Sequence, residues 1–203
     1  MRSKTTLVIA VLLSSALLVT GCAKPPQVEI DAAKAALDAA VAAKAETYAG
    51  PELSAAREAM NAAQAEIDTQ AGKFALFRSY KNAKTLLADA LTKANAAKDA
   101  AVANMEKAKQ EATAAIEAAK AAVAGAQTEL TTLEGCKRKP KGFAADLTVL
   151  KGTLDGLVAE LPNLDTSFGS EDYLGAKSAA EALTSRAQTL VTDLQNAKTK
   201  IKC

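Results

Sequence analysis

The chain has 203 residues, about a quarter of them alanine, with 25 basic and 23 acidic residues and neither histidine nor tryptophan. A net charge of only +2 gives no broad attraction to polyanions, so we expect no nucleic-acid partner. Without histidine, the commonest neutral-pH general base and the imidazole ligands of metal sites are missing. We therefore expect that the chain is not an enzyme and that it has no catalytic residue, no metal site and no cofactor.

The first 21 residues have the pattern of a secretory signal peptide. A basic start precedes an uncharged, mostly apolar run over residues 5–18, and small residues follow up to Gly21. The run is about 14 residues long, which is shorter than the roughly 20 that span a bilayer. We expect cleavage between Gly21 and Cys22.

The residues Val19-Thr20-Gly21-Cys22 resemble the lipobox of bacterial lipoproteins. That resemblance implies a diacylglycerol on the thiol of Cys22, cleavage before it and acylation of the new amino terminus. Two or more acyl chains hold a protein stably on a membrane. Ala23 follows the cysteine, which in this family favours the outer membrane. The alternative is an ordinary cleaved signal with an incidental cysteine.

Two helices are predicted after a short tether over residues 22–27. They cover residues 28–48 and 52–69, and Gly50-Pro51 between them is typical of a stop and a restart. Gly72 marks the next turn. Apolar residues at helical spacing define one face of each helix. These are Ile30, Leu37, Val41 and Tyr48 in the first, and Leu53, Ala56, Met60, Ala63 and Ile67 in the second.

A single helix of about 60 residues, on the order of 90 Å long, is predicted from residue 74 to 134. This segment contains no proline and only one glycine, Gly125. Its apolar stripe changes phase in the middle, in the manner of a four-residue stutter in a heptad pattern. The first phase contains Phe77, Tyr80, Leu87, Leu91 and Ala94. The second contains Val102, Ile116, Val123 and Leu130, together with Met105, Ala112, Ala119, Ala126 and Leu133.

Two more helices are predicted in the last 60 residues. The first covers residues 143–161, with leucines in 3–4 spacing, and Pro162 is expected to break it. Ser170 is a candidate N-cap for the last helix. That helix has an unbroken apolar seam of Tyr173, Ala176, Ala180, Leu183, Ala187, Leu190, Leu194, Ala197 and Ile201.

These elements predict an all-α fold, an elongated antiparallel helical bundle or coiled coil. Two short bundles, over residues 28–98 and 99–203, would share the long central helix. The segments that begin at Tyr80 and Tyr173 have similar sequences, which indicates a helix-pair repeat about 93 residues apart.

Two cysteines remain once Cys22 is lipidated. Cys136 and Cys203 are an even pair in an exported chain, where disulfides form. A bond between them would close the C-terminal bundle. The alternatives are two free thiols or pairing between chains.

Four cations lie in the turn that follows the long helix, namely Lys137, Arg138, Lys139 and Lys141. They are candidate contacts to anionic lipid headgroups or to an acidic partner. The other interpretation is that they only complement the dipole of the helix that ends before them.

The chain resembles the Ala-rich helical lipoproteins of Gram-negative bacteria, in particular a group with repeats of the type Tyr-Ala-x-Pro-x-Leu-x-x-Ala. The matching residues run from Tyr48 to Ala56, and there is a more distant similarity to the murein lipoprotein. The resemblance implies a lipid-anchored protein on the periplasmic face of the outer membrane, with an envelope protein or peptidoglycan as partner. Two functions are expected on this basis, a structural spacer or scaffold and a helical-repeat binding module. The sequence leaves the oligomeric state open.

Overall fold

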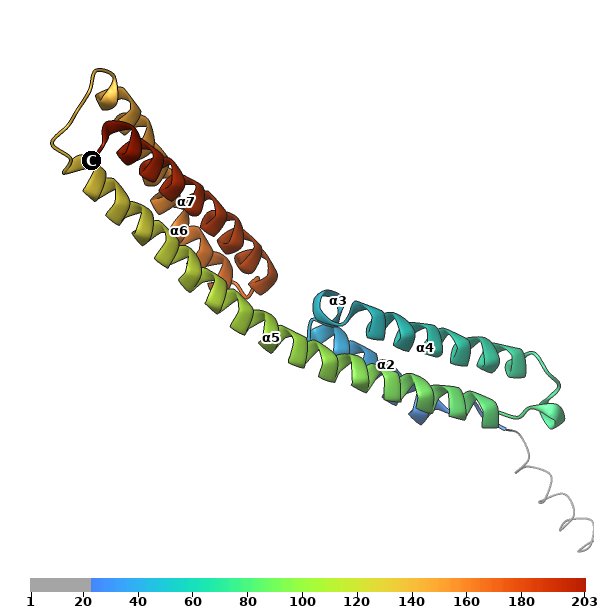
Figure 1. The fold of residues 1–203 in the computed structure, drawn as a ribbon. Helices are drawn as coiled ribbons and strands as arrows, with labels where there is room; N and C mark the ends of the chain where they lie inside the picture. The colour runs from blue at the N-terminus through green and yellow to red at the C-terminus, as the bar shows by residue number, and fades with distance from the viewer. Residues whose placement is uncertain (1–22) are drawn as a thin grey trace, which may run out of the picture. The chain divides into compact units, whose positions relative to one another are not determined.

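The computed structural model describes residues 23–203, and they form two compact units. Unit 1 ends at Asn104, and unit 2 runs from Met105 to Cys203. The described residues contain helices and turns and no strand (Figure 1). Among the described residues, the buried hydrophobic side chains run from Ile30 to Ile201. The predicted all-α fold is confirmed.

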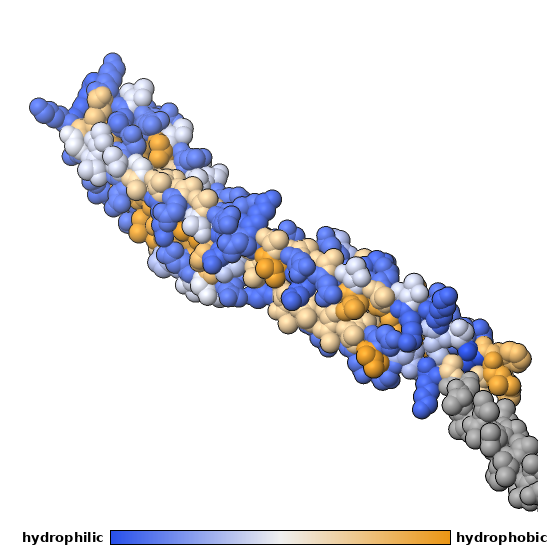
Figure 2. Space-filling model, turned by 90° about the horizontal axis from the view of Figure 1, so that it is seen from below, coloured by the Kyte–Doolittle hydropathy of each residue, from blue (hydrophilic) through white to orange (hydrophobic). Residues whose placement is uncertain are grey.

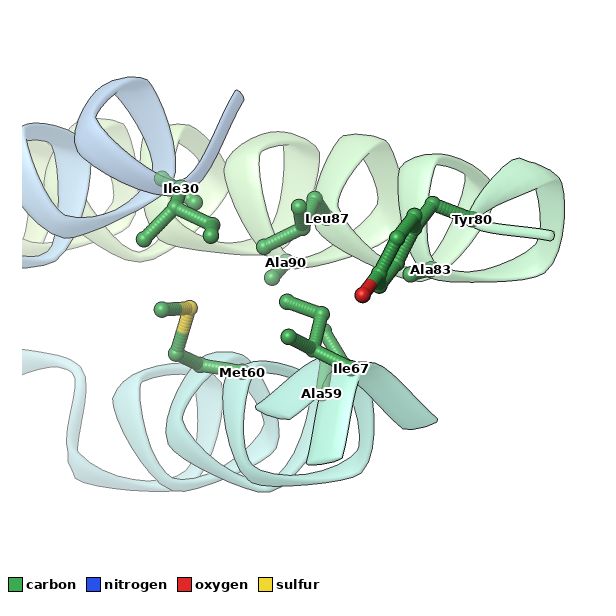
Figure 3. Close-up of a cluster of buried hydrophobic side chains, with 10 residues drawn as sticks. Ile30, Ala59, Met60, Ile67, Tyr80, Ala83, Leu87 and Ala90 are labelled. Carbon is green, nitrogen blue, oxygen red and sulfur yellow. The ribbon is translucent and has the colours of Figure 1, made fainter. Parts of the chain in front are cut away.

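Unit 1 is a bundle of three long helices and one short helix, in which alanine lines much of the contact surface. It contains α2 (Gln27–Ala42), the short α3 (Ala45–Tyr48), α4 (Gly50–Ala71) and the first part of α5 (Lys81–Glu134). Figure 3 shows one end of its core, where α2, α4 and α5 each supply side chains. Helix α4 runs antiparallel to the other two, because its later residues share this cluster with the early residues of α2 and α5.

Unit 2 is also a bundle of three helices. The rest of α5 packs with α6 (Phe143–Gly169) and α7 (Tyr173–Ile201). Ion pairs give the directions of the helices: Lys177 pairs with Glu111 and Lys198 with Glu129, so α7 is parallel to α5. Helix α6 runs the other way, since its early Lys151 pairs with the late α5 residue Glu134. Helix α5 therefore contributes to both units, as predicted.

Most of the buried residues are those that the alternating 3- and 4-residue spacing of apolar side chains predicted. Every predicted inward residue of α4 is buried, and so is every one of α7 except Ala197, which is half-buried. The change of phase in α5 is also present. The inward positions in this region are 97, 101, 105, 108, 112 and 116. Two four-residue steps follow one another twice, from 97 to 105 and from 108 to 116, where a heptad pattern would alternate steps of three and four residues. Val102 is an exception, because it is 48% exposed and does not belong to the seam.

The predicted single helix over residues 28–48 is wrong. Lys44 adopts a left-handed conformation with φ of 61°, which ends α2 and lets α3 start in a new direction. The break allows Ala45 and Ala49 to be buried against α5, while Val41, expected in the seam, is 41% exposed. A left-handed residue other than glycine costs roughly 1–2 kcal/mol. Burial of the alanines after the break offsets that cost.

The long helix starts later than predicted. Residues Ala75–Phe77 form the short 3-10 helix η1, and α5 begins only at Lys81, so it has 54 residues. Phe77 was expected in the seam but is 75% exposed. Extended backbone at Arg78 separates η1 from α5, which removes Phe77 from the periodic pattern of the helix.

Pro162 does not end α6, and Ser170 does not cap α7. Helix α6 continues through Pro162 to Gly169, because the turns beyond the proline bury Leu164. Proline leaves the carbonyl of Val158 without its helical donor, and Val158 lies on an exposed part of the helix, being 41% exposed. The N-cap of α7 is Asp172, whose side chain accepts a hydrogen bond from the backbone N–H of Gly175 at 3.0 Å.

The inward positions support an internal repeat over both units. Tyr80 through Ala101 in α5 match Tyr173 through Leu194 in α7 at a spacing of 93 residues, and each of the seven pairs is buried. Ile30, Ala33, Leu37 and Ala40 of α2 match the last four buried positions of α5 at the same spacing, although Leu37 is half-buried. At a spacing of 94 residues, three buried residues of α4 match buried residues of α6, namely Met60 with Leu154, Ala63 with Leu157 and Gln70 with Leu164. Thus the second half of α5 stands in unit 2 where α2 stands in unit 1.

A disulfide joins Cys136, just after α5, to Cys203, just after α7, with their Cα atoms 5.6 Å apart. Cys136 is 4% exposed. The bond closes a loop with a sequence separation of 67 residues. On the chain-entropy model, a loop of this length stabilises the folded state by about 4 kcal/mol.

The disulfide should therefore stabilise unit 2 selectively. We expect Cys203→Ser to lower its free energy of unfolding by about 4 kcal/mol, measured by amide hydrogen exchange with mass spectrometry, which reads the two units separately. Exchange in α4 should stay unchanged, and reduction of the native protein should reproduce the effect. Equal exchange in oxidised and reduced protein, or two thiols that react without reductant, would contradict the prediction.

Candidate functional site

The predicted site residues fall into two groups. Gly21 and Cys22, the residues of cleavage and lipidation, lie outside the described residues. Cys136 and Cys203 are brought together by the disulfide, and the predicted cations Lys137, Arg138, Lys139 and Lys141 follow Cys136 directly. The described part of unit 2 thus places these four cations beside the bond that ties α5 to α7.

The cations form a larger basic end than the sequence indicated. All four are exposed, and the disulfide brings Lys200 and Lys202, also exposed, to the same end of unit 2. Within residues 23–203 none of the six has an ion pair. The Lys-Ile-Lys-Cys sequence at 200–203 was the available signal for the last two. A surface of this kind attracts anionic groups.

A groove of about 360 Å³ lies between α6 and α7 at this end. Apolar side chains, among them Phe143 and Ile201, form part of its lining, and Asp146, Asp193 and Lys200 lie on it. The groove combines an apolar lining with charges of both signs, which suits an amphipathic peptide better than a small anion.

The titratable groups with shifted pKa values belong to ion pairs between helices. The hydrogen bond from Lys177 at 2.8 Å and its positive charge lower the pKa of the Glu111 carboxyl below about 4.5. Hydrogen bonds from Lys84 and Arg186 lower the pKa values of Glu29 and Glu160 in the same way. Each pair joins two helices of one unit, so these shifts indicate structural contacts rather than acid–base chemistry.

The described residues contain no cluster of side chains suited to metal binding. No group of three histidine, cysteine or carboxylate side chains in residues 23–203 could hold a metal ion. No helix in the same range has a stretch both long and apolar enough to cross a bilayer.

The turn between α4 and α5 is a surface that the sequence patterns missed. Phe74, Leu76 and Phe77 are 70%, 75% and 75% exposed. The helical spacing had placed Phe77 in a seam, and no periodic signal distinguishes a 3-10 turn from the start of a helix. Three large apolar side chains exposed together mark a binding surface more often than isolated ones do.

Acid should weaken the interhelical pairs. Folding lowers the pKa of Glu111 through its ion pair with Lys177. The contribution of this pair to the free energy of unfolding is therefore complete above about pH 4.5, and it is lost as the pH falls through the lowered pKa of the folded state. We expect the melting temperature to fall below pH 4.5, with a smaller fall in Glu111→Gln. Circular dichroism melts between pH 7 and pH 3 measure this. Asp155→Asn, an exposed carboxylate of α6 without an ion pair, is the control and should follow the native curve. Parallel curves for native protein and Glu111→Gln would contradict the assignment.

Comparisons with known proteins leave the function to be argued from the residues themselves. No protein-family model matches the chain, and neither a curated protein nor a solved structure matches it significantly. The resemblance to Ala-rich lipoproteins therefore stays a prediction from the lipobox and the Tyr48–Ala56 motif. The fold, the disulfide and the exposed surfaces are the structural observations on which a function can be based.

Proposed function

We propose that the chain is a non-enzymatic lipoprotein of the cell envelope that acts as a membrane-anchored structural spacer or scaffold in the periplasm. The lipid on Cys22 holds it on the periplasmic face of the outer membrane. The two helical units are its working part. It uses no cofactor apart from the covalent lipid.

The observation that carries this proposal is the junction at Cys22. An apolar run too short to span a bilayer ends on Gly21-Cys22, and the folded part begins within a few residues, with α2 at Gln27. Such a short tether keeps a folded body close to the membrane. The cores add support, because their buried side chains are nearly all apolar, with Gln70 as the buried polar side chain of residues 23–203.

A second candidate function is a helical-repeat binding module for an envelope protein or glycan. The groove between α6 and α7 favours it, since apolar lining and charged rims suit a partner helix or peptide. The basic end next to the groove would attract an acidic partner. Both functions require the same anchor, and they differ in whether one defined partner is bound.

The anchor is tested by Cys22→Ala. We expect this variant to move from the membrane fraction to the soluble fraction, because the acyl chains supply the membrane affinity. Fractionation of cells with immunoblotting measures the distribution, and mass spectrometry of the native protein should show the acylated amino terminus at residue 22. Cys136→Ser/Cys203→Ser, which keeps Cys22, is the matched control and should remain with the membrane. Unchanged membrane retention of Cys22→Ala would refute the lipid anchor.

The two candidate functions are separated by crosslinking in the intact envelope. A photoreactive residue at Val149, which is 68% exposed and lies on the groove, should yield one stoichiometric adduct if the groove binds a partner. The same residue at Glu58, on the exposed face of α4, is the control position. A scaffold without a dedicated partner predicts no dominant adduct at either position.

A further inference from the structure

We propose that the turn over residues 73–81 of unit 1 inserts its apolar side chains into the bilayer to which the chain is anchored. The turn would then be a second membrane contact that orients unit 1 against the lipid surface. This inference rests on the proposed anchoring at Cys22, because the anchor brings the turn to the bilayer.

The turn exposes three large apolar side chains. Phe74, Leu76 and Phe77 are 70%, 75% and 75% exposed, and the two phenyl rings have their centroids 6.4 Å apart. Figure 2 shows hydrophobic residues gathered at the end of this unit. An exposed cluster of this kind is unfavourable in water, and aromatic and leucine side chains are those that enter the boundary between headgroups and acyl chains.

Hydrogen bonds hold the turn in one conformation. Arg78 donates to the carbonyl oxygen of Lys73 at 2.8 Å and to that of Ala71 at 2.9 Å. The backbone N–H of Ser79 donates to the side-chain oxygen of Gln70 at 3.1 Å. The N–H of Phe77 donates to the carbonyl of Phe74 at 2.9 Å. The apolar side chains are thus presented by an ordered backbone, which reduces the entropy lost on insertion.

The charges of the turn complement an anionic bilayer. Residues 73–81 contain Lys73, Arg78 and Lys81 and no acidic residue. Lys73 and Lys81 are exposed and have no ion pair within residues 23–203. Basic residues next to an apolar cluster are typical of segments that lie in the membrane interface, where the cations contact lipid phosphates.

The turn lies at the end of unit 1 where the described chain begins. Ala23 packs against the core cluster that contains Ile67 and Tyr80, the buried residues on either side of the turn. Figure 1 shows the start of α2 and the turn before α5 at the same end of the unit. Ala23 is bonded directly to Cys22, so a lipid on Cys22 would place this end of the unit at the membrane.

The repeat provides an internal comparison. The segment of unit 2 at the same spacing, residues 166–174, spans the end of α6 and the turn into α7, and it contains Glu171 and Asp172 and no cation. Its aromatic residue Phe168 packs against Tyr173, with ring centroids 5.1 Å apart. A turn at this position of the fold therefore needs neither exposed aromatic residues nor basic charge. The features of residues 73–81 are additions to the fold, and a bilayer is the partner that matches both of them.

The test uses tryptophan as a reporter, because the chain has none of its own. Protein that begins at Cys22 and carries Phe77→Trp is coupled through the Cys22 thiol to a maleimide lipid in vesicles of phosphatidylethanolamine and phosphatidylglycerol. The disulfide keeps the other two cysteines from reacting. We expect a blue-shifted emission and at least about twofold quenching by lipids brominated in their acyl chains, since the indole enters the interface.

The matched control is Val41→Trp, an exposed apolar position at the other end of α2. Its emission should be the same with and without brominated lipid. Phe74→Ser/Leu76→Ser in the Phe77→Trp background should lose most of the quenching, and pure phosphatidylcholine vesicles should reduce it. Because all three apolar residues are exposed, these changes leave the core intact, which circular dichroism checks.

Emission of the tethered Phe77→Trp protein equal to that in solution would overturn the proposal. A dimer of the untethered protein that Phe74→Ser/Leu76→Ser dissociates, with no response to lipid, would assign the turn to a second copy and would also overturn it. The maleimide lipid replaces the natural anchor in this experiment. Its result is therefore independent of Cys22→Ala, and the two proposals can fail separately.

Discussion

Close packing of helices through alanine is the interaction on which both units depend. Each buried alanine removes little apolar area from water, on the order of 1 kcal/mol, so no single contact holds two helices together. Many such contacts must therefore form along the length of each helix, as at Ala83, Ala90, Ala94 and Ala97 of α5. Occasional large residues such as Leu87 and Leu183 fill the spaces between the alanines. Ion pairs between helices and the disulfide of unit 2 add to a core that is thin throughout.

Sequence periodicity predicted the helices and faces that follow a regular pattern. The inward residues of α4 and α7, and the change of phase in α5, were found where 3–4 spacing placed them. The failures are local. A left-handed Lys44 has no residue signature such as glycine, and Pro162 is tolerated because α6 has further apolar residues to bury beyond it. In each case tertiary packing outweighs a local preference of about 1–3 kcal/mol.

The candidate surfaces were predictable to different degrees. The pairing of Cys136 with Cys203 followed from counting cysteines, and the four cations after Cys136 were visible as a run. Lys200 and Lys202 join them because α7 runs parallel to α5 and the disulfide ties the two chain ends together. The exposure of Phe77 depends on a 3-10 turn and on the hydrogen bonds that Arg78 donates and the Gln70 side chain accepts. Those bonds connect the end of α4 to residues of the turn that follow no helical pattern, so periodicity could not reveal them.

The second half of α5 occupies in unit 2 the position that α2 occupies in unit 1. Duplication in this arrangement is economical, because a new unit requires only two additional helices when the last helix of one copy becomes the first helix of the next. The copies can also diverge in their turns, since the contacts that hold the bundle together lie between the helices. A gene built in this way can lengthen its product in steps of about 93 residues, and each step provides a new turn on which a different surface can evolve.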